Sequence, residues 1–167
     1  KLLVGGSFTS YNGIGVLGLV RLNADGSLDA TFNSGCTSNC GLDNSVSALA
    51  VQGDGKLLVG GYFTSYNGSG VLGLVRLNAD GSVDATFNSG CTSSCGFTGS
   101  PGTTAVVYAL AEQGDGKLLV GGWFLYYNGA SATYFTRLNA DGSLDATFNS
   151  GCTPSCGFDN MVWALAL

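Results

Sequence analysis

Three nearly identical copies of one segment constrain this chain more than any other feature of its sequence. The segment Arg-Leu-Asn-Ala-Asp-Gly-Ser-Leu-Asp-Ala-Thr-Phe-Asn-Ser-Gly-Cys occupies residues 21–36, recurs with one Leu replaced by Val at 76–91, and recurs unchanged at 137–152. Repetition at a spacing of roughly 55 residues is typical of modules that stack on one another, because so small a module cannot bury an adequate core alone. The 167 residues are therefore expected to form a repeat array.

The phase of the repeat divides the chain into three predicted modules. The first covers residues 1–55 and begins at the second strand of its unit, the second covers 56–116, and the third covers 117–167 and ends on a fourth strand. The second module carries a six-residue insertion around Gly99–Thr104. Insertions in repeat proteins gather on one exposed face, so we expect this one at the surface.

Glycine content and turn signals predict an all-β fold. The 28 glycines interrupt every window that could keep a helical apolar period. In the first module, strands are expected at 1–8, 15–22, 27–32 and 46–51, and the Gln-Gly-Asp-Gly sequence at 52–55 predicts a tight hairpin into the next module. Four short strands per module predict tandem four-stranded antiparallel blades, β-propeller-like, in three repeats.

Charge and residue types exclude several functions. The chain has no histidine, so it cannot form a Ser-His-Asp or Cys-His nucleophile system or an imidazole metal site, and we expect no catalytic residues and no enzyme activity. The net charge is −5 with only six lysines and arginines, which disfavours nucleic acid because its phosphates are bound by basic patches. No apolar run approaches the length of a membrane span.

The six cysteines form one Cys-x-x-x-Cys pair per module. An even number of locally paired cysteines predicts short-range disulfides and an oxidising compartment, which is extracellular or at the cell surface. The alternative is metal binding by thiolates, but two pairs must then converge on one ion, and a repeat array holds the pairs apart. The predicted disulfides are Cys36–Cys40, Cys91–Cys95 and Cys152–Cys156.

Two aspartates of the repeated segment are candidate oxygen ligands. Asp25 and Asp29 stand at a short spacing, as in a calcium loop, but the EF-hand spacing and its distal Glu are missing. We favour a turn in which Asp29 accepts hydrogen bonds or pairs with Arg21, and calcium at these loops is the secondary hypothesis. No other cofactor and no other metal is expected. The corresponding aspartates of the later modules are Asp80, Asp84, Asp141 and Asp145.

Aromatic residues that depart from the repeat are candidate ligand contacts. Trp123 stands where the first two modules have Ser7 and Tyr62, and Tyr126 stands where they have Ser. Flat aromatic faces can stack on sugar rings, so Trp123 and Tyr126 are the candidates for binding a glycan. Packing within a blade explains the other aromatic residues equally well.

Two longer motifs resemble a known repeat family. Residues 22–33 read Leu-Asn-Ala-Asp-Gly-Ser-Leu-Asp-Ala-Thr-Phe-Asn, and residues 46–63 follow the pattern Val-x-Ala-Leu-Ala-x-Gln-x-Asp-Gly-Lys-Leu-Leu-Val-Gly-Gly-x-Phe. Both are similar to the delta-60 repeat of bacterial surface and secreted proteins, and the resemblance covers essentially the whole chain. It implies a β-propeller-like fold and an extracellular bacterial setting. The glycine-flanked cysteine pairs are an addition to that pattern.

The two ends of the chain are predicted to complement each other. Residues 162–167 align with the expected strand at 46–51, and Lys1 aligns with Lys56, which follows the hairpin turn. Each end thus lacks the neighbour that the other supplies, and unpaired strand edges recruit other strands. The predicted assembly edge consists of Leu2, Leu3, Val4, Val162, Leu165 and Leu167.

These features favour a non-enzymatic extracellular structural protein that assembles with copies of itself through terminal strand exchange, into a ring or a fibre. Known propellers close with about four to eight blades, so three blades need completion. Three arrangements stay open: two chains in one six-bladed ring, a longer array that contains these residues, or blades stacked end to end as a fibre. The alternative function is a carbohydrate-binding or adhesive module, with glycans as partners.

Overall fold

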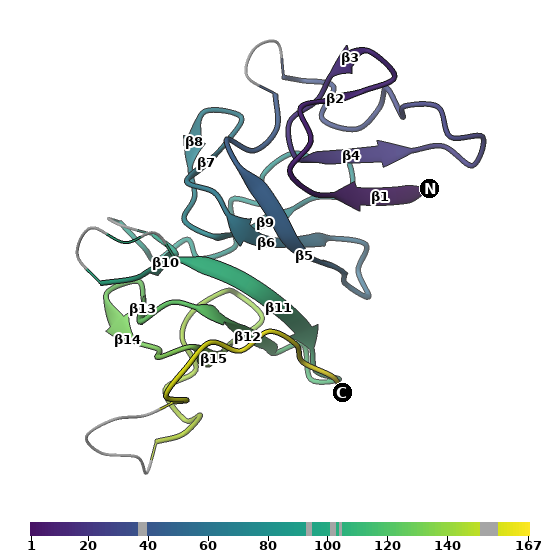
Figure 1. Cartoon of the computed structure of the whole chain (residues 1–167). Helices are drawn as coiled ribbons and strands as arrows, with labels where there is room; N and C mark the ends of the chain where they lie inside the picture. Colours follow the sequence, from purple (N-terminus) through teal and green to yellow (C-terminus); the bar gives the residue numbers. More distant parts are fainter. Residues whose placement is uncertain (37–39, 93–94, 101–102, 104, 151–156) are drawn as a thin grey trace.

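The strands form a stack of three antiparallel sheets that follow one another in chain order (Figure 1). The computed structural model describes residues 1–36, 40–92, 95–100, 103, 105–150 and 157–167. The first sheet pairs β1 (Leu2–Gly5) with β4 (Leu19–Leu22), the second has the order β5 (Ser45–Val51), β6 (Leu57–Tyr62), β9 (Leu74–Leu77), and the third has the order β11 (Val106–Glu112), β12 (Leu118–Trp123), β15 (Phe135–Leu138).

Short hairpins lie beside these sheets. They are β2 (Ser10–Tyr11) with β3 (Ile14–Gly15), β7 (Ser65–Tyr66) with β8 (Ser69–Gly70), and β13 (Tyr126–Tyr127) with β14 (Ala130–Ser131), which β10 (Phe97–Thr98) joins. An Asn-Gly pair turns each hairpin, with both residues at positive φ, as at Asn67 (50°) and Gly68 (78°). Asn-Gly is the preferred pair for such turns, and at Asn12 and Gly13 it joins β2 to β3.

The all-β prediction is confirmed, since the part of the chain that the structure describes contains no helix. It follows that no helix in that part is long and apolar enough to cross a membrane. The hairpin predicted at Gln52–Gly55 is also confirmed, because β5 pairs with β6 from Ser45↔Tyr62 to Val51↔Leu57. The same hairpin joins β11 to β12. Each hairpin therefore crosses a boundary between two predicted modules.

The middle sheet is buried on both faces. Along β6, Leu57 and Val59 pack into a core cluster shared with the first sheet, whereas Leu58 packs into a second cluster shared with the third sheet. Successive side chains of a strand point to opposite faces, so the continuous apolar run Leu-Leu-Val serves two cores. The cores are thus formed between modules, which explains why one module cannot fold well alone.

The strand predicted at 27–32 is wrong. Leu28 forms a single isolated bridge with Leu22, and the chain then turns. The turn is held by the Asp29 side chain, whose Oδ1 accepts hydrogen bonds from the Thr31 amide at 3.1 Å and the Thr31 hydroxyl at 2.7 Å. Local side-chain bonds of this kind compete with a strand ladder. The second predicted strand, 15–22, is also shortened to β4, because Gly15 pairs within the β2–β3 hairpin.

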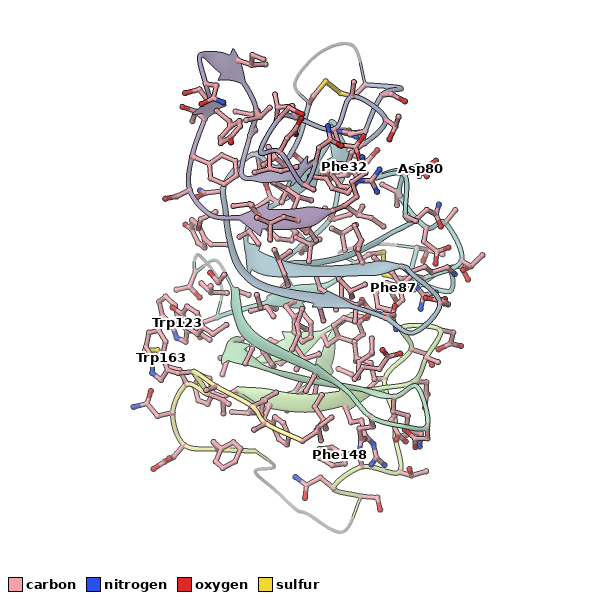
Figure 2. All side chains as sticks on the ribbon, turned by 90° about the vertical axis from the view of Figure 1, so that its right-hand side faces the viewer. Phe32, Asp80, Phe87, Trp123, Phe148 and Trp163 are labelled. Carbon is pink, nitrogen blue, oxygen red and sulfur yellow. A yellow bond between two sulfur atoms is a disulfide. The ribbon has the colours of Figure 1, made fainter. Side chains whose placement is uncertain are left out.

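The fourth strand predicted at Val162–Leu167 is not formed either. Residues 161–167 make one strand-like contact, from the Val162 amide to the Gly122 carbonyl at 3.3 Å, and Val162 packs on Gly121. β5 and β11 each pair with the strand that follows them across a hairpin, β6 and β12. Residues 161–167 pair with no strand of the described residues in this way. The first and third sheets lie at opposite ends of the stack, and the described sheets do not close into a ring (Figures 1 and 2).

Candidate functional site

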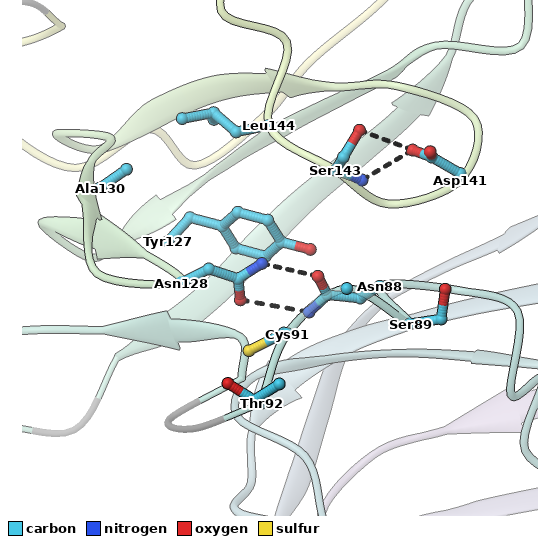
Figure 3. A pocket seen from close by; sticks show the side chains of 11 residues that line it. Asn88, Ser89, Cys91, Thr92, Tyr127, Asn128, Ala130, Asp141, Ser143 and Leu144 are labelled. Atoms are coloured by element: carbon cyan, nitrogen blue, oxygen red, sulfur yellow. Dashed lines mark hydrogen bonds between the residues drawn. The ribbon is translucent and has the colours of Figure 1, made fainter.

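Two equivalent pockets lie where consecutive modules meet, and they are the candidate functional sites. The first has a volume of about 590 Å³ and the second about 670 Å³. Figure 3 shows the second pocket, in which the side chains of Asn88 and Asn128 face each other across the junction between modules. Asn33 and Asn67 hold the corresponding places in the first pocket.

A reciprocal pair of amide hydrogen bonds crosses each pocket. Asn88 Nδ2 donates to Asn128 Oδ1 at 3.1 Å, and Asn128 Nδ2 donates to Asn88 Oδ1 at 2.6 Å (Figure 3). The Gly96 amide donates to the same Asn128 oxygen at 2.8 Å. In the first pocket, Asn33 and Asn67 bond to each other with the same two distances. We call each of these pairs an asparagine lock.

Backbone conformation presents both amides of a lock to each other. Asn67 and Asn128 occupy the first turn position of their Asn-Gly hairpins, with φ of 50° and 49°. Asn33 and Asn88 follow the turn of the repeated segment and have φ of 57°. Asparagine tolerates this left-handed region better than most residues, because its short polar side chain bonds locally. The residue type is therefore suited both to the turns and to the lock.

An aromatic contact closes the junction beside each lock. A Cβ atom added to Gly81 would lie 2.9 Å from the ring of Phe32, and one added to Gly142 would lie 2.7 Å from the ring of Phe87. Only glycine leaves room for the ring at these positions. Next to the rings, the backbone N–H of Asn33 donates to the backbone carbonyl of Asp80 at 2.7 Å. The backbone N–H of Asn88 donates to that of Asp141 at 2.7 Å. Adjacent modules are thus joined by side-chain and backbone contacts together.

The repeated arginine and aspartate form a buried ion pair under each junction. Arg76 Nε donates to Asp84 Oδ2 at 2.7 Å, and Lys56 Nζ lies 2.9 Å from the same oxygen. The guanidinium stacks over the Phe87 ring at 4.5 Å and donates to the Ala140 carbonyl of the next module. Burial alone raises the pKa of Asp84, but hydrogen bonds from Thr86, Lys56 and Arg76 outweigh it and hold the pKa well below 3.8.

These contacts favour the turn interpretation of the aspartate loops. Asp29 bonds to Arg21 Nε at 2.7 Å as predicted, and hydrogen bonds from Thr31 hold its pKa below 3.8. Asp25 Oδ1 accepts from the Ser27 amide at 3.0 Å and the Ser27 hydroxyl at 2.7 Å. The protein's own donors therefore engage both carboxylate oxygens of Asp29 and one of Asp25. Among the described residues, no cluster of three or more metal-ligating side chains is present.

The other predicted sites are placed as follows. The disulfides Cys36–Cys40 and Cys91–Cys95 are present, whereas Cys152 and Cys156 lie outside the described residues. Trp123 and Tyr126 are exposed at the adjoining ends of β12 and β13.

The structure does not bring the two halves of the predicted assembly edge together. Leu2, Leu3 and Val4 lie in β1 at one end of the stack, and residues 161–167 lie at the other end (Figure 1).

The asparagine locks were missed by sequence reasoning. The signal for them was available, because Tyr-Asn-Gly and Phe-Asn-Ser-Gly recur at fixed positions in all three modules. Each motif alone is explained by a turn, and only the structure shows that the two asparagines meet. The locked amides bond to each other, and Asp141 accepts from Ser143 in the same pocket (Figure 3). What the arrangement can do chemically is to hold modules together.

Comparison with known families agrees with this architecture. A family model described as "Domain of unknown function (DUF5122) beta-propeller" matches residues 1–32, 52–87 and 113–148, which make up more than half of the chain. The chain therefore belongs to this β-propeller family, and the predicted membership of a propeller-like repeat family is confirmed. The matched segments end before the cysteine loops. No curated protein and no solved structure matches the chain.

Proposed function

We propose that the chain is a non-enzymatic extracellular structural protein whose copies assemble through strand exchange. The observation that carries this proposal is the open edge of β1. The strands β6 and β12 pair on both sides, whereas among the described residues β1 pairs with β4 alone. Leu2 is consequently 59% exposed, although the corresponding Leu57 is 6% exposed. An open, apolar strand edge of this kind is a template for another strand.

The donated strand is residues 162–167 of another copy. In the hairpin between the first two modules, Val46 pairs with Gly61, Leu49 with Val59 and Val51 with Leu57. Transferred to the joint between copies, this register pairs Val162 with Gly6, Leu165 with Val4 and Leu167 with Leu2. Each backbone bond adds about 0.5–1.5 kcal/mol net, and each buried Leu or Val about 1.5–3 kcal/mol, before the cost of ordering.

Sedimentation of the 167-residue chain tests the proposal. We expect a concentration-dependent increase in mass, and smaller species when Met161–Leu167 is deleted. A peptide of residues 162–167 should compete with assembly, whereas a scrambled peptide of the same composition should not. A stable monomer at micromolar concentration, with the amides of Leu2–Val4 protected from hydrogen exchange, would contradict strand exchange. Electron microscopy of the assembled material then distinguishes a ring from a fibre.

Two further features belong to this proposal. We propose that each repeat supplies one four-stranded blade, and the isolated bridges Leu22↔Leu28, Leu77↔Val83 and Leu138↔Leu144 support an outer, fourth position in each. The disulfides in successive cysteine loops support an oxidising compartment, and hence an extracellular or cell-surface location.

A second candidate function is glycan binding, and a group of exposed aromatic rings favours it. Trp163 is 64% exposed and stacks on Tyr108 with ring centroids 4.2 Å apart. Trp123, which is 41% exposed, lies on the same edge of the stack (Figure 2). Tyr126 follows three residues later and is 40% exposed. Such rings present flat apolar faces that can stack on sugars.

A glycan array tests this second function. If Trp123 contacts a sugar, Trp123→Ser, which installs the residue of the first module, should abolish binding with little change in melting temperature. Tyr62→Ser provides a matched control, because it makes the same replacement at the corresponding position of the second module. Absence of binding by the unaltered protein would remove this function.

A further inference from the structure

The two internal junctions use one set of contacts, and each set has an outgoing and an incoming half. The outgoing half comes from the repeated segment of one module: the arginine, the phenylalanine and the lock asparagine. The incoming half comes from the next module: the hairpin asparagine, the glycine under the ring, and two backbone carbonyls. The outgoing residues are Arg21, Phe32, Asn33 and then Arg76, Phe87, Asn88, while the incoming ones are Asn67, Ala79, Asp80, Gly81 and then Asn128, Ala140, Asp141, Gly142.

Within the described part of residues 1–167, no following module contacts the outgoing half of the third module. Arg137 Nε donates to Asp145 Oδ2 at 2.8 Å, and the Arg137 guanidinium stacks over the Phe148 ring at 4.6 Å, as those of Arg21 and Arg76 do over Phe32 and Phe87. Asn149 has φ of 61°, close to the 57° of both internal counterparts. Its side chain is exposed and has no hydrogen bond to another described residue, whereas Asn33 and Asn88 are half-buried in their locks.

The first module carries the matching incoming half. Asn12 has φ of 49°, the value found at Asn128 and within one degree of Asn67. It too is exposed, while those two residues are half-buried. Gly26, in the same left-handed conformation as Gly81, is held by a hydrogen bond from the Tyr11 hydroxyl to its carbonyl at 2.7 Å. The backbone at Asn149, Asn12 and Gly26 already has the conformation of the internal junctions, so association would cost less in ordering these residues.

We infer that Asn149 and Phe148 of one copy meet Asn12 and Gly26 of a second copy, forming a third asparagine lock and a third inter-module pocket across the joint. This inference rests on the proposed self-assembly and names its contact surface. A single neighbouring copy can form both the third lock and the exchanged strand. Within the chain, the strand that receives β5, which is β6, and the asparagine that receives Asn33, which is Asn67, likewise belong to one module. The contact is head-to-tail, because the outgoing half of one copy meets the incoming half of the next. Each copy can therefore bind one neighbour at each end.

The decisive variant carries Asn12→Asp and Asn149→Asp. Aspartate keeps the size of asparagine and tolerates the same backbone conformation, but two facing carboxylates repel and supply no donor. By sedimentation at pH 7 we expect association at least about tenfold weaker than wild type, since 1.4 kcal/mol corresponds to tenfold. Lowering the pH to about 4.5 should restore part of the association. Two carboxylates that share a site raise the pKa of one of them, which then takes up a proton.

Two controls separate the lock from other effects. Asn44→Asp with Asn160→Asp adds the same charge but keeps both side-chain oxygens that accept from Ser45 and Met161, so association should stay close to that of wild type. Asn33→Asp with Asn67→Asp breaks an internal lock, so it should lower the melting temperature, whereas the end variant should leave it unchanged.

The outcomes distinguish the two proposals. If the unaltered chain is monomeric, the proposed self-assembly itself fails. If the unaltered chain assembles and the Asn12→Asp, Asn149→Asp variant assembles equally well at pH 7, strand exchange stands and the third lock is wrong. An equal loss in the charge control would also overturn the lock, because net charge would then explain the effect.

Discussion

At the scale of single residues, the buried arginine–aspartate pair is the most demanding feature of the repeat. Arg76 and Asp84 have side chains only 8% and 5% exposed, and each carries hydrogen bonds beyond the pair itself. Removing one partner of a buried pair leaves the other charge uncompensated, which costs more than the pair contributes. The repeated segment is therefore held by charge as well as by packing.

Asp84→Asn should destabilise the chain by about 3–5 kcal/mol, the range found when one partner of a buried pair is removed. Asp54→Asn is the matched control, because Asp54 is exposed and its ion pair with Lys56 spans 3.9 Å. Its effect should stay below about 1 kcal/mol. Urea unfolding followed by circular dichroism measures both. Equal effects of the two substitutions would contradict the structural role of the buried pair.

The same carboxylates predict how stability depends on pH. The pKa values of Asp29, Asp84 and Asp145 are lowered below 3.8 in the folded state, so the unfolded chain binds more protons in acid. Their stabilising effect is fully present above about pH 4 and is lost as the pH falls through the folded pKa values. The urea midpoint should change little between pH 7 and 5 from these groups and fall below pH 4. A midpoint that rises in acid would contradict this prediction.

At the scale of elements, close approach between sheets depends on one glycine per module. A Cβ atom added to Gly60 of β6 would lie 2.6 Å from Val107 Cγ1 of β11, and Gly5 and Gly121 face Val46 and Val162 in the same way. A strand glycine that meets a neighbouring strand so closely has a packing role. The glycine pairs of the sequence thus permit the stacking of sheets.

Gly60→Ala should push β6 and β11 apart and destabilise the chain by about 1–3 kcal/mol, the usual cost of overpacking. Gly70→Ala is the matched control, because a Cβ atom there would meet nothing within 4 Å and the glycine has no positive φ. Differential scanning calorimetry should show a lower melting temperature for Gly60→Ala alone. A larger loss for Gly70→Ala would contradict the packing argument.

Reduction of the disulfides should leave most of the β signal in circular dichroism. Cys36–Cys40 and Cys91–Cys95 join residues only four apart, in loops outside the three main sheets. Closing so short a loop removes little entropy from the unfolded chain. Loss of the β signal in reducing buffer, without other change, would show that the loops hold the sheets together.

Local patterns predicted some elements and not others. The Asn-Gly and Asp-Gly turns were predictable, because their positive φ values restrict the choice of residue. The strand at 27–32 was wrong because alternation of apolar and polar residues does not reveal that Asp29 would bond to Thr31 and turn the chain. The recurring asparagines did not by themselves reveal the locks, since a turn explains each motif and Asn33 and Asn67 meet only after two modules stack.

At the scale of the whole molecule, both core clusters, the two lock pockets and the locks themselves lie between modules. Stability should then depend on how many junctions are formed, as in other repeat arrays. Deleting the third module should cost more than the loss of its own residues implies, because it removes one junction and exposes Leu58 and Val107 of the second core cluster.

Trp163 stacks on Tyr108. The other tryptophan of the chain, Trp123, lies on the same edge of the stack of sheets (Figure 2). In a second copy joined as proposed, Ser47 holds the position that corresponds to Trp163, so the joint would cover part of the exposed Trp163 ring. Under the proposed strand exchange, Trp163 would report the joining of copies through its own fluorescence. Its fluorescence should shift to shorter wavelength as concentration rises, without any attached dye, and the shift should disappear in a chain that carries Trp163→Phe.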